Sequence, residues 1–311
     1  MNSRLAWIGL SLGMIACSDD KDAPGTGGGA HYTYVASELA VPTNNSQARE
    51  YGLDLNGDGS VDNQLGQMFG TLVVQGFDVQ SSVTTGVDRG STIQLFDFAA
   101  DNLSNDATAS VAMKWGDPAT ANPAACASGA DTQCRRHLQG MGTFTLAPDS
   151  PNVAALSGAF SGGIFNGGPG TLPLAITLGA APLKATLMGA RIRARGASES
   201  AVETIIVAGA MSEADVQAKL IPAMALSFSA QVSADCHAPG QLDCGCAESS
   251  SGKTLIALFD VAPRDCTISS EEVSGSSLIQ ALLSPDVVID GTPGLSLGLK
   301  AKAVKAMFPT E

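Results

Sequence analysis

The chain after residue 62 carries apolar residues every three or four positions, the pattern of a helix with one buried face. These residues are Leu65, Met68, Phe69, Leu72 and Val73. A helix is therefore expected to begin directly after the polar run that ends at Asn63. Val79, Val83 and Val87 continue at similar spacing and predict a second, shorter helix.

Beyond Gly90 the pattern changes to short alternating or apolar runs. "STIQLFDFAA" and "ATASVAMKWGD" have strand lengths, and the turn-like "DNLSND" separates them. Further strands are expected at 141–146, 156–165, 172–178, 183–195 and 201–207. The glycine-rich "SGGIFNGGPG" is interpreted as a loop between two of them. Because few helical patterns intervene, the sheet is expected to be mostly antiparallel.

The last third of the chain mixes helical and strand patterns. Ser212 is a candidate cap for a helix over "MSEADVQAKLIPAMALSFSAQ", which Pro222 should kink or restart. "GKTLIALFD" fits a helix or a strand, "SSEEVSGSSLIQALLS" is helical in its second half, and "LSLGLKAKAVKAMF" alternates as a closing strand. The predicted fold class is α+β, with a sheet-rich, mostly antiparallel body flanked by a few helices and stabilised by disulfides.

The N-terminal segment "MNSRLAWIGLSLGMIACSDDKD" has one cation, a short apolar run and a small residue before Cys17. The run is too short to span a bilayer and is typical of a signal-peptide core. Residues 14–17 resemble the lipobox of bacterial lipoproteins, which implies that Cys17 is lipidated and becomes the new N-terminus. By analogy with lipoprotein sorting, the serine after it favours the outer membrane.

These observations divide the chain into three parts. Residues 1–16 are predicted to be the lipoprotein signal peptide, and residues 17–32 a lipid-anchored, glycine-rich tether. Residues 33–311 are predicted to form a single α+β domain. Within it, an acidic loop and helices occupy 52–89, a sheet-rich part 90–210, and a helix plus a disulfide-rich closing segment 211–311.

The net negative charge of the chain limits the classes of molecule that it is expected to bind. Its 311 residues include 30 Asp and Glu against 17 Lys and Arg, a net charge of -13. Such a chain repels phosphate backbones, so nucleic acid is not an expected partner. Divalent cations are the more natural ones.

The cysteines are consistent with an exported protein. With Cys17 assigned to the lipid, an even number remains and predicts up to three disulfides. The six are Cys126, Cys134, Cys236, Cys244, Cys246 and Cys266. The first two close a short loop and are expected to pair, whereas the other four allow three pairings that stay open. A zinc site using His237 in "CHAPGQLDCGC" is the alternative, but its spacing is not of the C-x₂-C type.

The strongest chemical signal is the run "DLNGDGSVDN". Its oxygen-bearing side chains stand at alternate positions, as in a calcium-binding loop, and Gly59 allows the sharp bend. These residues are Asp54, Asn56, Asp58, Ser60 and Asp62. Leu65 stands where an EF-hand has its bidentate glutamate, so the oxygen shell is incomplete.

The loop therefore resembles dockerin-type or thrombospondin type 3 calcium loops more than a full EF-hand. The resemblance implies a calcium ion. Because the oxygen shell is depleted, calcium is expected to bind weakly, with a dissociation constant on the order of 10⁻⁴–10⁻³ M, and to serve stability. The alternative is an ordinary polar turn, because Asp, Asn and Gly also favour turns.

A later segment, "FDVAPRDCTISSEEV", faintly repeats the spacing of a calcium-binding loop between Asp260 and Glu272. Arg264 at a ligand position argues against a metal there, and Cys266 is expected to attach the last helices to the body.

The H-E-x-x-H motif, the P-loop and the dinucleotide fingerprint are absent from the sequence. Asp or Glu residues distant in sequence could still meet in a cleft, so an exported hydrolase acting on an extracellular polymer is the alternative function.

One basic feature stands out on this acidic chain. Arg191, Arg193 and Arg195 share one face of a predicted strand, as a docking stripe or as solvated charges paired with carboxylates.

Taken together, the lipobox, spacer and "YGLDLNGDGSVDNQLG" resemble surface lipoproteins of bacteria such as myxobacteria. The expected function is that of a lipid-anchored, calcium-stabilised protein of the outer membrane with a binding or structural role. Its expected partners are the membrane, through the anchor, and an envelope protein or glycan.

Overall fold

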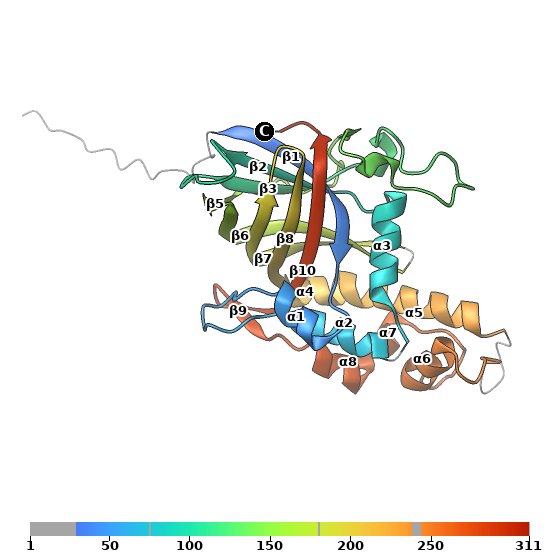
Figure 1. The fold of residues 1–311 in the computed structure, drawn as a ribbon. Coiled ribbons are helices and arrows are strands. Elements are labelled where there is room, and N and C mark those ends of the chain that lie inside the picture. The colour runs from blue at the N-terminus through green and yellow to red at the C-terminus, as the bar shows by residue number, and fades with distance from the viewer. Residues whose placement is uncertain (1–28, 75, 180, 238–243, 311) are drawn as a thin grey trace, which may run out of the picture.

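The computed structural model describes residues 29–74, 76–179, 181–237 and 244–310 and contains one 10-stranded sheet (Figure 1). Cys17, the signal peptide and most of the predicted tether lie outside the described residues. The strands are β1 (Ala30–Ala40), β2 (Gln94–Ala100), β3 (Ser110–Trp115), β4 (Gly142–Thr143), β5 (Leu156–Ser161), β6 (Ile164–Leu178), β7 (Ala181–Ala197), β8 (Ala201–Ser212), β9 (Val287–Ile289) and β10 (Thr292–Met307).

The sheet closes on itself. Its order is β1-β2-β3-β5-β6-β7-β8-β10, and β10 pairs in turn with β1, so the eight strands form a ring of antiparallel neighbours. Among the strands that the structure describes, only the short β4 runs parallel to its partner, β10. The predicted α+β class, with a mostly antiparallel and disulfide-stabilised body, is therefore confirmed.

The core lies between the inward faces of the strands. On β7, Ile192 and Ala194 are buried whereas Arg193 and Arg195 are exposed, so the alternation read from the sequence sets the two faces of the strand. Phe98 and Phe165 meet edge to face across the interior, with ring centroids 5.2 Å apart. An inner face of this kind gives the large hydrophobic burial that stabilises a domain.

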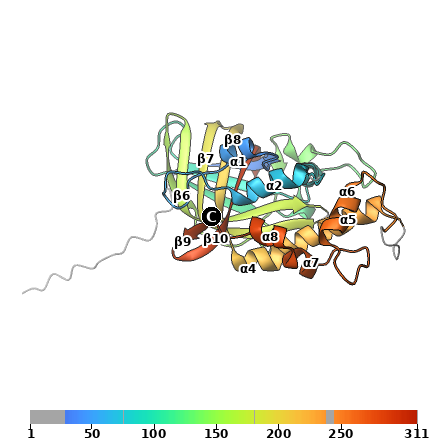
Figure 2. The same ribbon diagram turned by 90° about the horizontal axis from the view of Figure 1, so that it is seen from below.

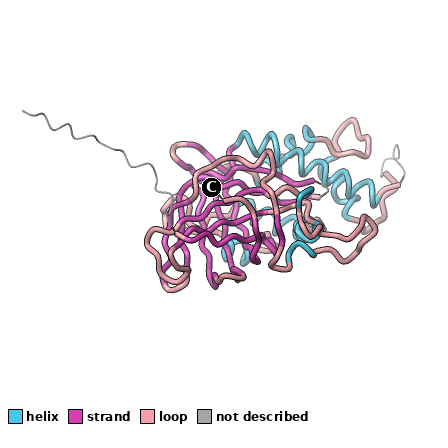
Figure 3. The backbone as a smooth tube through the Cα atoms, turned by 90° about the horizontal axis from the view of Figure 1, so that it is seen from above, coloured by secondary structure: helices cyan, strands magenta, loops and turns pink. Residues whose placement is uncertain are grey.

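The helices gather at one end of the ring. They are α1 (Asn45–Tyr51), α2 (Gln64–Val74), α3 (Val79–Arg89), α4 (Glu213–Asp215), α5 (Ile221–Asp235), α6 (Ser251–Phe259), α7 (Ser270–Gly275) and α8 (Ser277–Leu282). Figure 2 shows α1 and α2 on one side of this end and α4, α7 and α8 on the other, and Figure 3 shows most of the strands and helices at opposite ends of the molecule. No helix in the described part of the chain is long and apolar enough to cross a membrane.

Several sequence-based expectations about the helices are confirmed. The α2 helix begins at Gln64, directly after the acidic loop, and buries Leu65, Met68, Phe69 and Leu72. The side chain of Ser212 accepts a hydrogen bond from the Asp215 N–H and so caps α4. Pro222 stands in the first turn of α5, where its missing N–H is tolerated, and a π-helical turn over Val216–Leu220 joins the two helices.

Other expectations were wrong in their boundaries. Strand β1 begins at Ala30, inside the segment assigned to the tether, and neither β1 nor α1 was predicted. The segment "SGGIFNGGPG" is not all loop, because Gly162 and Gly163 make the turn and Ile164–Leu178 is strand β6. Only Gly142–Thr143 of the strand predicted at 141–146 is formed.

Candidate functional site

The acidic loop connects α1 to α2 and is closed by backbone pairing between Leu53 and Asp62. The Asp54 carboxylate accepts hydrogen bonds from the N–H groups of Gly57 and Gly59, at 2.6 and 3.0 Å. Asp58 accepts one from the Ser60 N–H at 2.7 Å. Gly57 and Gly59 have φ of 81° and 86°, a conformation that glycine adopts without strain. The loop is thus shaped by its own carboxylates.

The ionisation of the loop carboxylates differs with their surroundings. Hydrogen bonds from the Ser60 N–H and the Asn56 side chain lower the pKa of Asp58, which lies in solvent. Burial raises the pKa of Asp62, and the hydrogen bond from the Leu55 N–H only partly offsets this effect. Asp62 is 9% exposed, so the loop turns one carboxylate inward and leaves Asp58 outside.

Asn63 anchors the loop to the body. Its side-chain amide donates to the carbonyls of Ala48 and Gly298, at 2.9 and 3.0 Å, and its oxygen accepts from the N–H groups of Gly298 and Gly66, at 2.8 and 3.0 Å. Strand β1 ends at Ala40, opposite Lys300, so Gly298 lies beyond the end of that pairing. The Asn63 amide takes the place of the missing strand there and also caps α2. This role was missed in the sequence, where Asn63 looked like one more polar residue of the loop.

Whether the loop can bind calcium depends on how close its side-chain oxygens lie to one another. Two oxygens bound to one calcium ion at about 2.4 Å lie within about 4.8 Å of each other. Among the described His, Cys, Asp and Glu residues, the only set of three with ligand atoms this close is Cys244, Asp260 and Cys266. The loop carboxylates do not form such a set, so binding by all three requires the loop to tighten.

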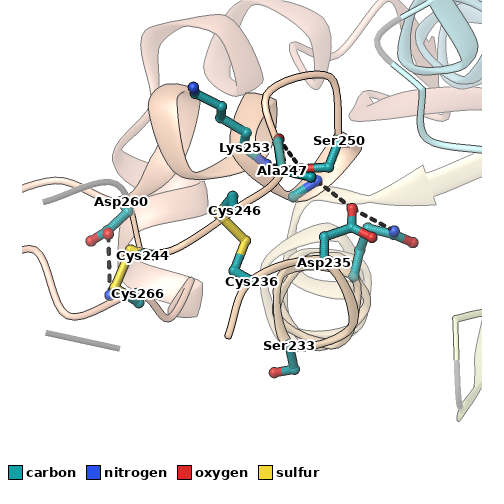
Figure 4. Close-up of a disulfide and its surroundings, with 12 residues drawn as sticks. Ser233, Asp235, Cys236, Cys244, Cys246, Ala247, Ser250, Lys253, Asp260 and Cys266 are labelled. Carbon is teal, nitrogen blue, oxygen red and sulfur yellow. Dashed lines mark hydrogen bonds between the residues drawn. A yellow bond between two sulfur atoms is a disulfide. The ribbon is translucent and has the colours of Figure 1, made fainter. Parts of the chain in front are cut away.

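The Cys244, Asp260 and Cys266 set is not available to a metal, because its two sulfurs form a disulfide. The Asp260 carboxylate instead accepts hydrogen bonds from the N–H groups of Asp265 and Cys266, and Figure 4 shows the second of these. Glu272 forms a capping box with Ser269 at the start of α7. The segment from Asp260 to Glu272, whose sequence faintly resembles a calcium loop, is therefore a structural turn.

The disulfides resolve the pairing that the sequence left open. Cys126 pairs with Cys134, as predicted, and the other two bonds are Cys236–Cys246 and Cys244–Cys266. The zinc alternative is therefore wrong, since none of its cysteines keeps a free thiol. Figure 4 shows the two later bonds beside the end of α5, where Asp235 accepts a hydrogen bond from the Gly252 N–H of α6. These contacts attach the α6–α7 segment to α5.

An exposed histidine in the segment predicted to be tether pairs with a buried aspartate. His31 Nδ1 of β1 lies 2.9 Å from both carboxylate oxygens of Asp97 on β2. Burial raises the pKa of Asp97, while His31 and the ammonium group of Lys114 act in the opposite direction. Within the described residues, His31 makes no side-chain hydrogen bond except with Asp97. The pair lacks the hydrogen-bonded nucleophile of a hydrolytic triad there, and the hydrolase alternative stays an untested prediction.

The three arginines lie on β7 as the pattern indicated, on the outer face of the closed sheet. Arg193 Nε donates to the side-chain oxygen of Asn166 on β6, at 3.2 Å. Arg191 Nε is buried and has no hydrogen-bond partner. Within the described part of the chain, none of the three forms an ion pair, so the interpretation of charges paired with carboxylates does not apply.

The arginines are not equivalent. Arg191 and Arg193 line a hollow of about 400 Å³ together with Asn166 and, from the acidic loop, Asp54 and Gly57. Arg195 does not line this hollow. The two features that stood out in the sequence, the acidic loop and the arginines, are thus neighbours in space.

Comparison of the chain with models of protein families, with curated proteins and with solved structures found no match.

Proposed function

We propose that this protein is exported and anchored by a lipid on Cys17 to the outer membrane of a bacterial envelope, where its domain has a binding or structural role. The observation that carries the proposal is the pairing of cysteines. Six of the seven are joined in disulfides, which persist in an oxidising compartment, and the one left over is the cysteine of the lipobox. Disulfides and lipobox thus support the same compartment.

The anchor is tested by expressing the full chain and its Cys17→Ala variant in a Gram-negative host and labelling with a radioactive fatty acid. The wild-type chain is expected to take up label and to partition into detergent with the outer-membrane fraction, because acyl chains provide the membrane affinity. The variant should carry no label. Ser18→Ala is the matched control and should be labelled like the wild type. Absence of label from the wild type would contradict the proposed anchor.

We also propose that the domain is stabilised by calcium bound at Asp54, Asn56, Asp58, Ser60 and Asp62. Two properties support this proposal. The side chains offer oxygen donors, which calcium prefers, and the Leu53–Asp62 pairing with the Asn63 amide fixes both ends of the loop to the body. Calcium would draw the carboxylates together and relieve their mutual repulsion. Because the shell lacks a bidentate glutamate, binding is expected to be weak and to matter for stability.

A further inference from the structure

A continuous depression runs along the outer face of β6 and β7. The hollow beside Arg191 and Arg193 shares Gly168 with a second hollow of about 620 Å³, and shares Arg191 with a third of about 450 Å³. The second is mainly apolar, and Ala154, Ala155 and Pro169 are among the exposed residues that line it. One end of the depression is therefore basic and the other apolar.

The depression exists because β6 and β7 are irregular at this point. Their register shifts on both sides of Gly170, and β7 shifts against β8 between Met188 and Arg191. Gly168 has φ of 102°, and a Cβ there would lie 2.4 Å from the Ala190 carbonyl oxygen, so only glycine fits. Bulges of this kind change the direction of neighbouring side chains. Here they flank the strand segment that carries Arg191.

Within the described residues, Arg191 and Arg193 form no ion pair, and Arg193 only donates a hydrogen bond to the uncharged Asn166 side chain. On β10, by contrast, Lys300 and Lys302 pair with Glu50 and Glu38, each at 2.9 Å. Asp54 shares the hollow with the arginines, but its oxygens accept the Gly57 and Gly59 N–H groups and it forms no ion pair with them. A buried donor without an acceptor, such as Arg191 Nε, is costly. An acceptor group on a ligand would satisfy it.

We propose that this depression binds an organic anion. Its carboxylate, sulfate or phosphate group lies against Arg191 and Arg193, and its uncharged apolar part lies along Ala155 and Pro169. The planar guanidinium groups match the geometry of such oxyanions and bind them through charge-assisted hydrogen bonds. The apolar hollow buries the apolar part of the ligand and so adds affinity that a free inorganic ion, which has no such part, does not gain. The site does not depend on the lipid of Cys17.

Titration calorimetry of the mature chain without its lipid-bearing Cys17, residues 18–311, tests this proposal with benzoate, its neutral analogue benzamide, and inorganic sulfate as probes. Benzoate is expected to bind more tightly than both, because it alone combines an oxyanion with an apolar ring. Arg191→Gln and Arg193→Gln should each weaken benzoate binding about tenfold or more. Arg195→Gln, on the same face of the same strand but outside the hollow, is the matched control and should bind like the wild type.

Three results would overturn the proposal. One is absence of benzoate binding at tens of millimolar, and another is equal weakening by Arg195→Gln, which would indicate only general surface charge. The third is equal affinity for sulfate and benzoate, which would mean that the apolar hollow takes no part. Arg193 is exposed, so its variant should fold even if replacing the half-buried Arg191 disturbs the sheet.

Discussion

Asn63→Ala is expected to destabilise the domain more than any other single change in the acidic loop. Asn63 is 2% exposed, and its removal leaves the Gly298 and Gly66 N–H groups and the Ala48 and Gly298 carbonyls without this partner. At the lower bound of about 1 kcal/mol for each buried group left unsatisfied, the loss is roughly 4 kcal/mol. This exceeds the loss of about 1 kcal/mol typical of a helix cap alone.

Urea unfolding of the mature chain, followed by far-ultraviolet circular dichroism, measures this loss as a fall in the free energy of unfolding. Gln67→Ala is the matched control, because it removes an exposed amide from the same helix and should change stability by less than about 0.5 kcal/mol. Asn63→Ser should recover part of the loss, since serine caps helices but does not reach both carbonyls. A loss below about 1 kcal/mol for Asn63→Ala would refute the anchoring role.

Two further predictions concern the disulfides and a buried histidine. Replacing Cys244 and Cys266 together by serine opens a loop with a sequence separation of 22 residues and should lower the free energy of unfolding by roughly 3 kcal/mol on the chain-entropy model. An unchanged urea midpoint, with the Cys126–Cys134 pair intact as an internal control, would contradict it. His137 is fully buried, and burial, helped by the positive charge of Arg135, lowers its pKa to about 4. In the unfolded chain the histidine pKa is near 6.5, so as the pH falls the unfolded chain is protonated at His137 before the folded chain is. The contribution of the neutral, buried His137 to stability is therefore complete above about pH 6.5 and is lost as the pH falls toward 4. His137→Leu should flatten the fall in melting temperature over that window, and an identical pH profile in wild type and variant would disprove the assignment.

The parts of the fold that could be predicted are those set by local pattern. The α2 helix follows from the spacing of Leu65, Met68, Phe69 and Leu72, and its start follows from the polar loop before it. The Cys126–Cys134 bond follows from its short separation. In each case the interacting residues are close together in the sequence, so the pattern itself carries the information.

The parts that could not be predicted depend on partners distant in the sequence. His31 follows a glycine-rich stretch, and only its pairing with Asp97, 66 residues later, makes it part of a strand face. The Cys236–Cys246 and Cys244–Cys266 bonds depend on how α5, α6 and the following turn pack. Arg191 and Arg195 look alike in the sequence, and the irregular pairing around Gly170 distinguishes them.

If calcium stabilises the folded domain through the acidic loop, the melting temperature of the mature chain must depend on calcium. With a dissociation constant of about 1 mM, 10 mM calcium should add about 1.4 kcal/mol by mass action, which raises the melting temperature by roughly 2–4 °C over its value in EDTA. The double variant Asp54→Ala, Asp58→Ala should lose this rise, whereas Asp265→Ala, in the segment read as a structural turn, should keep it. Identical melting of the wild-type chain in calcium and in EDTA would contradict the claim and leave the loop as a polar turn.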